Sequence, residues 1–265
     1  LLKRNFLWYS LMKSVPTVLR DIIYNDGFYR SINKGVSTLH GTINNYAVLD
    51  YLPELTDFTA QSGTYTFMVN ELTHSPAFLQ APDYTPLGDV TDKGSGPFAD
   101  NGYYHVNISS LLLLGEWLDH LRASGAYHNT RIIIVADHGE PVSTPVFPQE
   151  FDLPTRPEYF NPLLLVKDFN QSGELRTDLS FMTNADTIHL ATNNLNVSNL
   201  NPFTGEKIEN QKELNNGIIN LHTQKHVNWQ ATSLLKANQF ELDGTIYQIK
   251  DNIFKKENWT VKEDK

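Results

Sequence analysis

The chain has 265 residues, of which 40% are hydrophobic, enough for one large core or a core plus a small appendage. Its formal net charge is −9 and no cluster of Lys and Arg interrupts that acidity, which argues against nucleic-acid binding through electrostatics. It has no cysteine, which excludes disulfides, thiolate metal sites and a cysteine nucleophile within these residues.

The first sixty residues are predicted to be helix-rich. Apolar residues at near-helical spacing over residues 6–23 are interrupted by Pro16, which predicts a short helix on either side of the proline. Residues 43–58 form a second helical passage, broken at Pro53. The longest apolar runs of the chain are far shorter than the roughly 20 residues that a membrane-spanning helix needs.

The next segments predict a strand, a loop and a helix. Residues 64–69 are rich in Thr, Tyr, Phe and Val and predict a strand, which ends in a polar segment containing His74. Residues 77–102 are rich in Pro, Gly and Asp and predict a long surface loop. Residues 103–124 carry an apolar face at helical spacing, and Gly125 is expected to end this helix.

The segment 131–140 is the most informative one for function. Its β-branched apolar run predicts a buried strand, and it ends in Asp137, His138 and Gly139 at the edge where α/β sheets place their ligands. A carboxylate oxygen with an imidazole nitrogen suits Zn or Mn. Gly139 removes side-chain bulk and permits a positive φ beside such a site. Taken alone, the tripeptide favours a capped turn bearing a surface histidine over a metal site, and the other segments of the chain reverse that preference.

The rest of the chain completes the predicted fold. A helix, a short turn and a strand in succession imply a parallel sheet, to which residues 162–166 add another buried strand. A further helix is expected from Asn184 onward. We therefore predict an α/β three-layer sandwich with a mostly parallel central sheet over residues 1–220. Residues 221–265 are predicted to form a small β-rich C-terminal appendage, with strands at 226–235, 239–242 and 245–250.

Three of these segments, in this order and spacing, resemble the sulfatase-like branch of the alkaline phosphatase superfamily. Within that branch they look like the membrane-anchored lipoteichoic acid synthase-like and phosphoethanolamine transferase-like enzymes. The resemblance covers roughly residues 24–205. It is carried by Asn-Glu-Leu-Thr-His-Ser-Pro at 70–76, by Asn-Thr, a strand and Asp-His-Gly-Glu at 129–140, and by Asn-Pro-Leu-Leu-Leu-Val-Lys at 161–167. The segment 129–140 is the most specific of the three.

The resemblance implies roles for four residues. Asp137 and His138 match the family's metal-binding pair, His74 matches the histidine that contacts the transferred phosphate or sulfate, and Glu140 matches a catalytic acid. The implied cofactor is a divalent metal, Mn, Zn or Ca. The implied activity is metal-dependent transfer or hydrolysis of a phosphate group (phosphoglycerol or phosphoethanolamine) on a phospholipid-derived or otherwise phosphorylated or sulfated cell-envelope substrate. The alternatives are a sulfate-ester hydrolase and a non-catalytic sulfatase-like binding module.

The chain also departs from the family pattern. The family's first acidic metal ligand and its Thr or Ser nucleophile precede every segment matched here, and neither is found in this sequence. Pro141 follows Glu140 where several transferases carry another functional residue. We therefore expect the C-terminal part of a catalytic domain, with only part of the active site and no activity alone. The parent protein is expected to be extracytoplasmic and anchored to the membrane by segments outside this chain.

Overall fold

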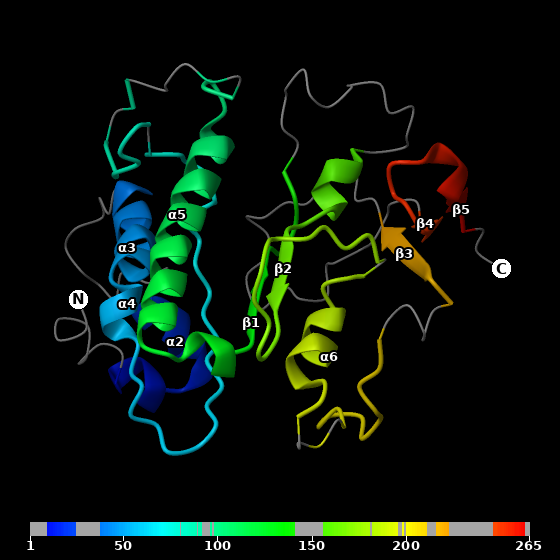
Figure 1. Cartoon of the computed structure of the whole chain (residues 1–265), viewed down its shortest axis with the longest axis horizontal. Helices are drawn as coiled ribbons and strands as arrows, with labels where there is room; N and C mark the ends of the chain where they lie inside the picture. Colours follow the sequence, from blue (N-terminus) through cyan, green and yellow to red (C-terminus); the bar gives the residue numbers. More distant parts are fainter. Residues whose placement is uncertain are drawn as a thin grey trace. The chain divides into compact units, whose positions relative to one another are not determined.

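The computed structural model describes residues 10–24, 38–79, 81–88, 90–91, 96, 98–140, 156–180, 182–195, 198, 200–210, 216–222 and 246–262. The strands predicted at 226–235 and 239–242 lie outside these residues, as does most of the proline-rich segment after Glu140. The described residues contain both helices and strands, so the mixed α/β class is confirmed (Figure 1). The chain divides into two units, Leu1–Trp117 and Leu118–Lys265.

Helices dominate the N-terminal unit, and prolines and a glycine set several of their ends. Pro16 directly precedes α2 (Thr17–Tyr24), as predicted. Pro53 lies in the first turn of α4 (Leu52–Leu55), where a residue needs no N–H because that position has no helical partner. Gly125 takes a φ of +78° just beyond the longest helix, which confirms it as the residue that ends that helix. No helix within the described residues combines the length and apolar character that a bilayer crossing requires. Residues 10–14, before Pro16, are also helical, so the helices predicted on either side of this proline are confirmed. The helices of this part whose bounds are described are α2 (Thr17–Tyr24), α3 (Thr38–Asp50), α4 (Leu52–Leu55) and α5 (Gly102–Ala123).

The core of this unit joins α3, α5 and the segment between them. Five apolar side chains are buried against one another, and burying each contributes about 1.5–3 kcal/mol. They are Leu49, Leu72, Leu79, Val106 and Leu113. Because Leu72 is only 1% exposed and lies two residues before His74, this core fixes the position of the turn that carries the histidine.

The strand predicted at residues 64–69 is wrong for the described part of the chain. These residues form no strand, and the side chains of Tyr65, Phe67 and Val69 are 79%, 75% and 70% exposed. The composition of a segment indicates how well it fits a half-buried pleated surface, and a strand forms only where a partner supplies the ladder. None of the described residues pairs with this segment.

The C-terminal unit contains the strand that leads to the Asp-His-Gly segment. β1 (Ile132–Val135) pairs with β2 (Leu164–Lys167), so both predicted strands are confirmed to within two residues. The pairing is antiparallel, with Ile132 opposite Lys167 and Val135 opposite Leu164. Parallel neighbours need a crossover connection, usually a helix. Among the described residues between β1 and β2 only the 3-10 helix η2 (Pro157–Phe160) is present, and no parallel sheet occurs in the described part.

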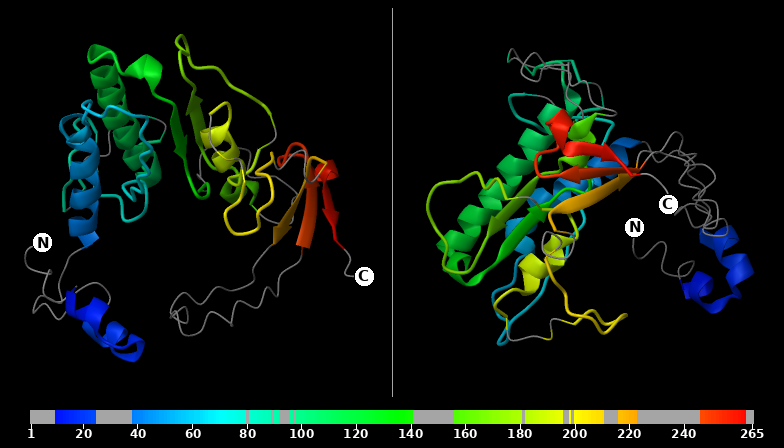
Figure 2. Two further views of the ribbon diagram at one scale, coloured as in Figure 1. Left: turned by 90° about the horizontal axis from the view of Figure 1, so that it is seen from below. Right: turned by 90° about the vertical axis from the view of Figure 1, so that its right-hand side faces the viewer.

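A second sheet lies near the C-terminus. β3 (Ile218–His222), β4 (Ile246–Lys250) and β5 (Trp259–Val261) form an antiparallel sheet in that order, visible as the orange and red strands of Figure 2. β4 matches the strand predicted at 245–250. The indole of Trp259 is buried against Leu221 and Ile249 and donates a hydrogen bond to the Ile253 carbonyl at 2.8 Å.

Candidate functional site

The residues expected to bind a metal lie immediately beyond β1. Ala136 continues the strand for one more residue, since its N–H donates to the carbonyl of Leu163 at 2.9 Å. Asp137 and His138 follow as the backbone leaves the sheet. The buried Ile132 anchors the other end of the strand in the core. A short, well-paired strand thus presents the two side chains at its carboxyl end, as the sequence predicted.

The contacts of His138 with its two neighbours in sequence orient its ring. The Nδ1 of His138 lies 2.8 Å from the carbonyl of Gly139, and a carbonyl can only accept, so this nitrogen carries the proton. In the neutral ring with this tautomer Nε2 carries the lone pair, and it lies 3.9 Å from Oδ2 of Asp137. The other oxygen, Oδ1, accepts the backbone N–H of His138 at 3.0 Å. Metal-binding histidines usually donate their other ring N–H to a carbonyl or a carboxylate, and the contact between Nδ1 and the Gly139 carbonyl is of this kind.

The distance and exposure of this pair allow both side chains to bind one ion after a small adjustment. Zinc binds nitrogen and carboxylate oxygen at about 2.0–2.2 Å in tetrahedral geometry, so two donors of one ion lie about 3.4 Å apart. The separation of 3.9 Å is wider by about 0.5 Å, which a small rotation of either side chain removes. The side chains of Asp137 and His138 are 92% and 56% exposed, so an ion and its other ligands have access to them. Within the described ranges, no group of three or more His, Asp or Glu side chains is placed to hold a metal.

Gly139 is needed for close packing and not for an unusual backbone angle. The positive φ expected at this residue is wrong, since Gly139 is not among the residues with positive φ. A Cβ added there would lie 2.0 Å from the backbone oxygen of Glu158. The Gly139 N–H also donates to the carbonyl of Tyr159 at 3.0 Å. The absence of a side chain lets η2 pack directly on the turn that carries Asp137 and His138.

Glu140, the expected catalytic acid, is half-buried and lies in the electrostatic field of Arg156. The pKa of Arg156 is raised, chiefly by its hydrogen bond to Glu158 at 2.9 Å and to a smaller extent by the charge of Glu140. The described contacts thus place Glu140 beside a cation and an acid. They assign it no bond to Asp137 or His138.

His74 belongs to the N-terminal unit, and its turn is well anchored there. The His74 N–H donates to the carbonyl of Glu71 at 3.0 Å, and the side chains of Asn45 and Asn70 link this turn to α3. Its ring resembles that of His138, since Nδ1 lies 2.6 Å from the carbonyl of Ser75. Nε2 lies on an exposed side chain, where it can accept a hydrogen bond in the neutral ring and donate one in the protonated ring.

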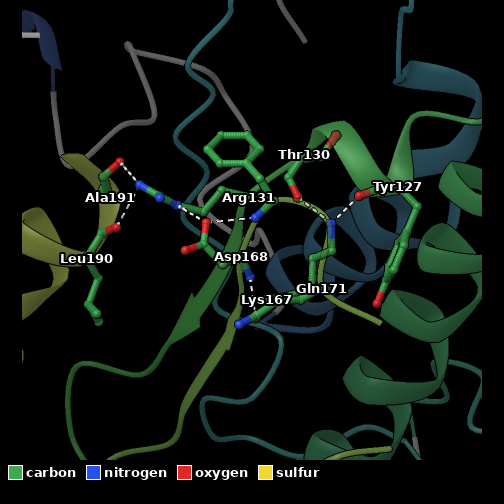
Figure 3. A network of polar contacts seen from close by, with 9 residues as sticks. Tyr127, Thr130, Arg131, Lys167, Asp168, Gln171, Leu190 and Ala191 are labelled. Carbon is green, nitrogen blue, oxygen red and sulfur yellow. Dashed lines mark hydrogen bonds and ion pairs between the residues drawn. The ribbon is translucent and has the colours of Figure 1, made fainter. Parts of the chain in front are cut away.

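At the start of β1, the opposite end from Asp137 and His138, Arg131 connects β1, β2 and the helix α6 (Asp186–Thr192), as Figure 3 shows. Its side chain is 8% exposed and donates to Asp168 at 2.8 Å and to the carbonyls of Leu190 and Ala191 at 3.1 and 2.9 Å. The guanidinium lies 4.8 Å from the ring centre of Phe169. The hydrogen bond from Arg131 lowers the pKa of Asp168 below its usual value. Arg131 thereby satisfies two of the carbonyls in the last turn of α6, where helical N–H partners run out.

A second cation, Lys167, supports the start of the same strand. Its Nζ donates to the carbonyls of Tyr127 and Thr130, the latter at 2.7 Å, and lies 4.2 Å from the centre of the Tyr127 ring. Burial lowers the pKa of Lys167. The two labelled cations of Figure 3 therefore bind carbonyls at the ends of neighbouring elements, which holds the chain before β1 in place.

Sequence reasoning missed the residue that contacts the Asp137 backbone from the side. The Nδ2 of Asn184 donates to the carbonyls of Ala136 and Asp137 at 3.1 and 2.8 Å. The sequence indicated Asn184 only as the approach to a helix, and nothing local to it points to a partner so distant along the chain.

Comparison with protein families, with curated proteins and with solved structures finds no match to this chain.

Proposed function

We propose that this chain contributes part of the active site of a metal-dependent enzyme that transfers or hydrolyses a phosphate-containing group on a cell-envelope substrate. The observation that carries the proposal is the Asp137–His138 pair, with Nε2 facing Oδ2 at 3.9 Å and Nδ1 held by a backbone carbonyl. The sulfatase-like resemblance supplies the substrate class, phosphoglycerol or phosphoethanolamine. The three-layer fold with a mostly parallel central sheet is part of the same proposal.

The residues of the chain have separate tasks in this proposal. Asp137 and His138 hold a divalent cation, which polarises the phosphoryl oxygens and lowers the pKa of an attacking hydroxyl. His74, once protonated on Nε2, donates a hydrogen bond to a non-bridging oxygen or a proton to the leaving oxygen. Glu140 provides a carboxylate beside Arg156 at the edge of the site. The remaining ligand and the nucleophile are proposed to come from outside this chain.

Metal analysis and turnover of the full-length protein test the proposal. We expect near-stoichiometric Mn or Zn after dialysis, and release of diacylglycerol from vesicles of phosphatidylglycerol or phosphatidylethanolamine. Asp137→Ala and His138→Ala are expected to lose the metal and turnover together, whereas His74→Ala keeps the metal and loses turnover by about 100-fold or more.

Asp119→Ala is the matched control, because it removes a carboxylate that is 78% exposed and forms a surface ion pair with Arg122. It is expected to keep both metal and turnover. Wild-type turnover in Asp137→Ala would refute the proposal. Turnover on an aryl sulfate with none on the two phospholipids would indicate a sulfate-ester hydrolase instead.

A further inference from the structure

The turn that carries the proposed metal pair is held from the side by a residue that is 47 positions away along the chain. Asn184 precedes α6 and uses one nitrogen, Nδ2, to bind two successive carbonyls, those of Ala136 and Asp137. An amide nitrogen carries two hydrogens, so both are used in these bonds. The two oxygens flank the α-carbon of Asp137, which gives this contact a specific geometric consequence.

The consequence follows from the planarity of the peptide bond. The carbonyl oxygen of Ala136 lies in the peptide plane before the α-carbon of Asp137, and the oxygen of Asp137 lies in the plane after it. Only φ and ψ of Asp137 set the angle between these planes. A single amide bound to both oxygens restricts both angles at once. The direction of the Cα–Cβ bond of Asp137 is fixed with them, and so is the base from which its carboxylate extends.

Asn184 can impose this geometry because its own turn is rigid. Asp186 is 1% exposed, and its Oδ2 accepts the backbone N–H and the hydroxyl of Thr183 at 2.7 and 3.2 Å. The Asp186 N–H donates in return to the Thr183 carbonyl at 3.0 Å. At the other end of the helix, Arg131 binds the carbonyls of the last turn. Asn184 therefore extends from an element anchored at both ends.

The ends of the 136–139 turn are also fixed, which leaves Asp137 as the position that Asn184 controls. The N–H of Ala136 is bound to Leu163, and the N–H of Gly139 is bound to Tyr159. Between these anchors the His138 N–H is bound by Oδ1 of Asp137 itself. Without Asn184, the carbonyl oxygens of Ala136 and Asp137 lose the hydrogen bonds that they accept from its side chain.

We propose that Asn184 is a positioning residue for the Asp137–His138 pair, which it orients through the two peptide planes around Asp137. The inference rests on the metal-binding role proposed above. The competing explanation is an ordinary surface hydrogen bond, since the side chain of Asn184 is exposed. That explanation predicts no effect on metal affinity.

The test compares Asn184→Ala and Asn184→Asp with the wild-type full-length protein. The Asp variant keeps the shape of the side chain, but its carboxylate cannot donate to the carbonyls. Asn107→Ala is the matched control, because it also removes an exposed amide-to-carbonyl bond, from Nδ2 to the Tyr103 carbonyl at 2.7 Å in α5. Mn²⁺ and Zn²⁺ affinities are measured by calorimetry. Amide hydrogen exchange of residues 136–139 is measured on the metal-free protein.

We expect both Asn184 variants to bind metal about tenfold more weakly, at the lower end of the effect of losing a supporting contact around metal ligands. Exchange at His138 and Gly139 should become faster while the thermal midpoint stays unchanged, and Asn107→Ala should match the wild type in both. Wild-type affinity in Asn184→Ala would overturn this inference while leaving the metal site standing. A wild-type protein that binds neither ion would refute the metal site and this inference together.

Discussion

Replacing Gly139 with Ala tests the packing that surrounds the candidate site. The new Cβ would lie 2.0 Å from the Glu158 oxygen, 3.1 Å from the Asn161 oxygen and 3.2 Å from the Glu158 carbonyl carbon. Real Cβ atoms essentially never approach within 3.0 Å, so η2 and the turn must separate by at least 3.0 − 2.0 = 1.0 Å. The obstructing atoms belong to the backbone, and no side-chain rotation relieves the contact.

The free energy of unfolding is expected to fall by about 2–4 kcal/mol. Overpacking a well-filled region costs about 1–3 kcal/mol. A separation of this size also stretches the 3.0 Å bond from the Gly139 N–H to Tyr159 beyond hydrogen-bonding range, at about 1 kcal/mol. For a unit of this length each kcal/mol lowers Tm by about 2–4 °C, so a loss of roughly 10 °C is expected.

Urea unfolding followed by circular dichroism measures this loss. Gly115→Ala is the matched control, because nothing lies within 4 Å of its added Cβ and it is inside α5, where alanine is favoured by up to about 1 kcal/mol. The expected pattern is a destabilised Gly139 variant and an unchanged or stabilised Gly115 variant. Equal stability of Gly139→Ala and the wild type would refute the argument that η2 needs this close approach.

Two further predictions concern stability. Arg131→Met should lower the free energy of unfolding by about 2–3 kcal/mol. This is less than for a fully buried ion pair, because Asp168 is 38% exposed. Arg122→Met is the control: Arg122 forms a surface pair, and its loss should cost under about 1 kcal/mol. Because Arg131 lowers the pKa of Asp168, the carboxylate stabilises the fold above its unfolded pKa, and this stabilisation is lost as the pH falls. The difference in the free energy of unfolding between wild type and Arg131→Met, measured by urea titration, should therefore become smaller below about pH 4. A difference that stays constant with pH would contradict the assignment. Trp259→Ala should lower the free energy of unfolding by about 3–5 kcal/mol. Trp259→Phe should lower it distinctly less, because that variant loses only the hydrogen bond to the Ile253 carbonyl and part of the ring. Thermal unfolding followed by circular dichroism measures both losses, and a larger loss in Trp259→Phe than in Trp259→Ala would contradict this assignment.

Local chemistry made parts of the fold predictable from the sequence. Pro16, Pro53 and Gly125 act through their own backbone restrictions, and the structure uses each of them at a helix end. β1 was predictable because its β-branched run is short and ends abruptly in polar residues. The same composition failed for residues 64–69, because whether an apolar run becomes a strand depends on a partner that the run itself does not specify.

The candidate site was predictable only in its local part. Adjacent ligand-type residues after a strand predict Asp137 and His138 as a metal-binding pair, and the structure places the two side chains 3.9 Å apart beyond the end of β1. The supporting contacts join residues far apart in sequence, such as Asn184 with Asp137 and Arg131 with Ala191. A single sequence contains no signal for such pairs. The reason for Gly139 likewise emerged only from the backbone of Glu158 opposite it.

The exposed segment at residues 64–69 has a consequence for the handling of this chain in solution. It combines Thr, Tyr, Phe, Met and Val without a charge or a proline, and it leaves Tyr65 and Phe67 largely in water. Such six-residue runs can pair edge to edge between copies, and natural proteins usually interrupt them with lysine or proline. Self-association at high protein concentration is therefore expected to begin at this segment. Binding to a single copy of the chain must be measured below the concentration at which this association starts.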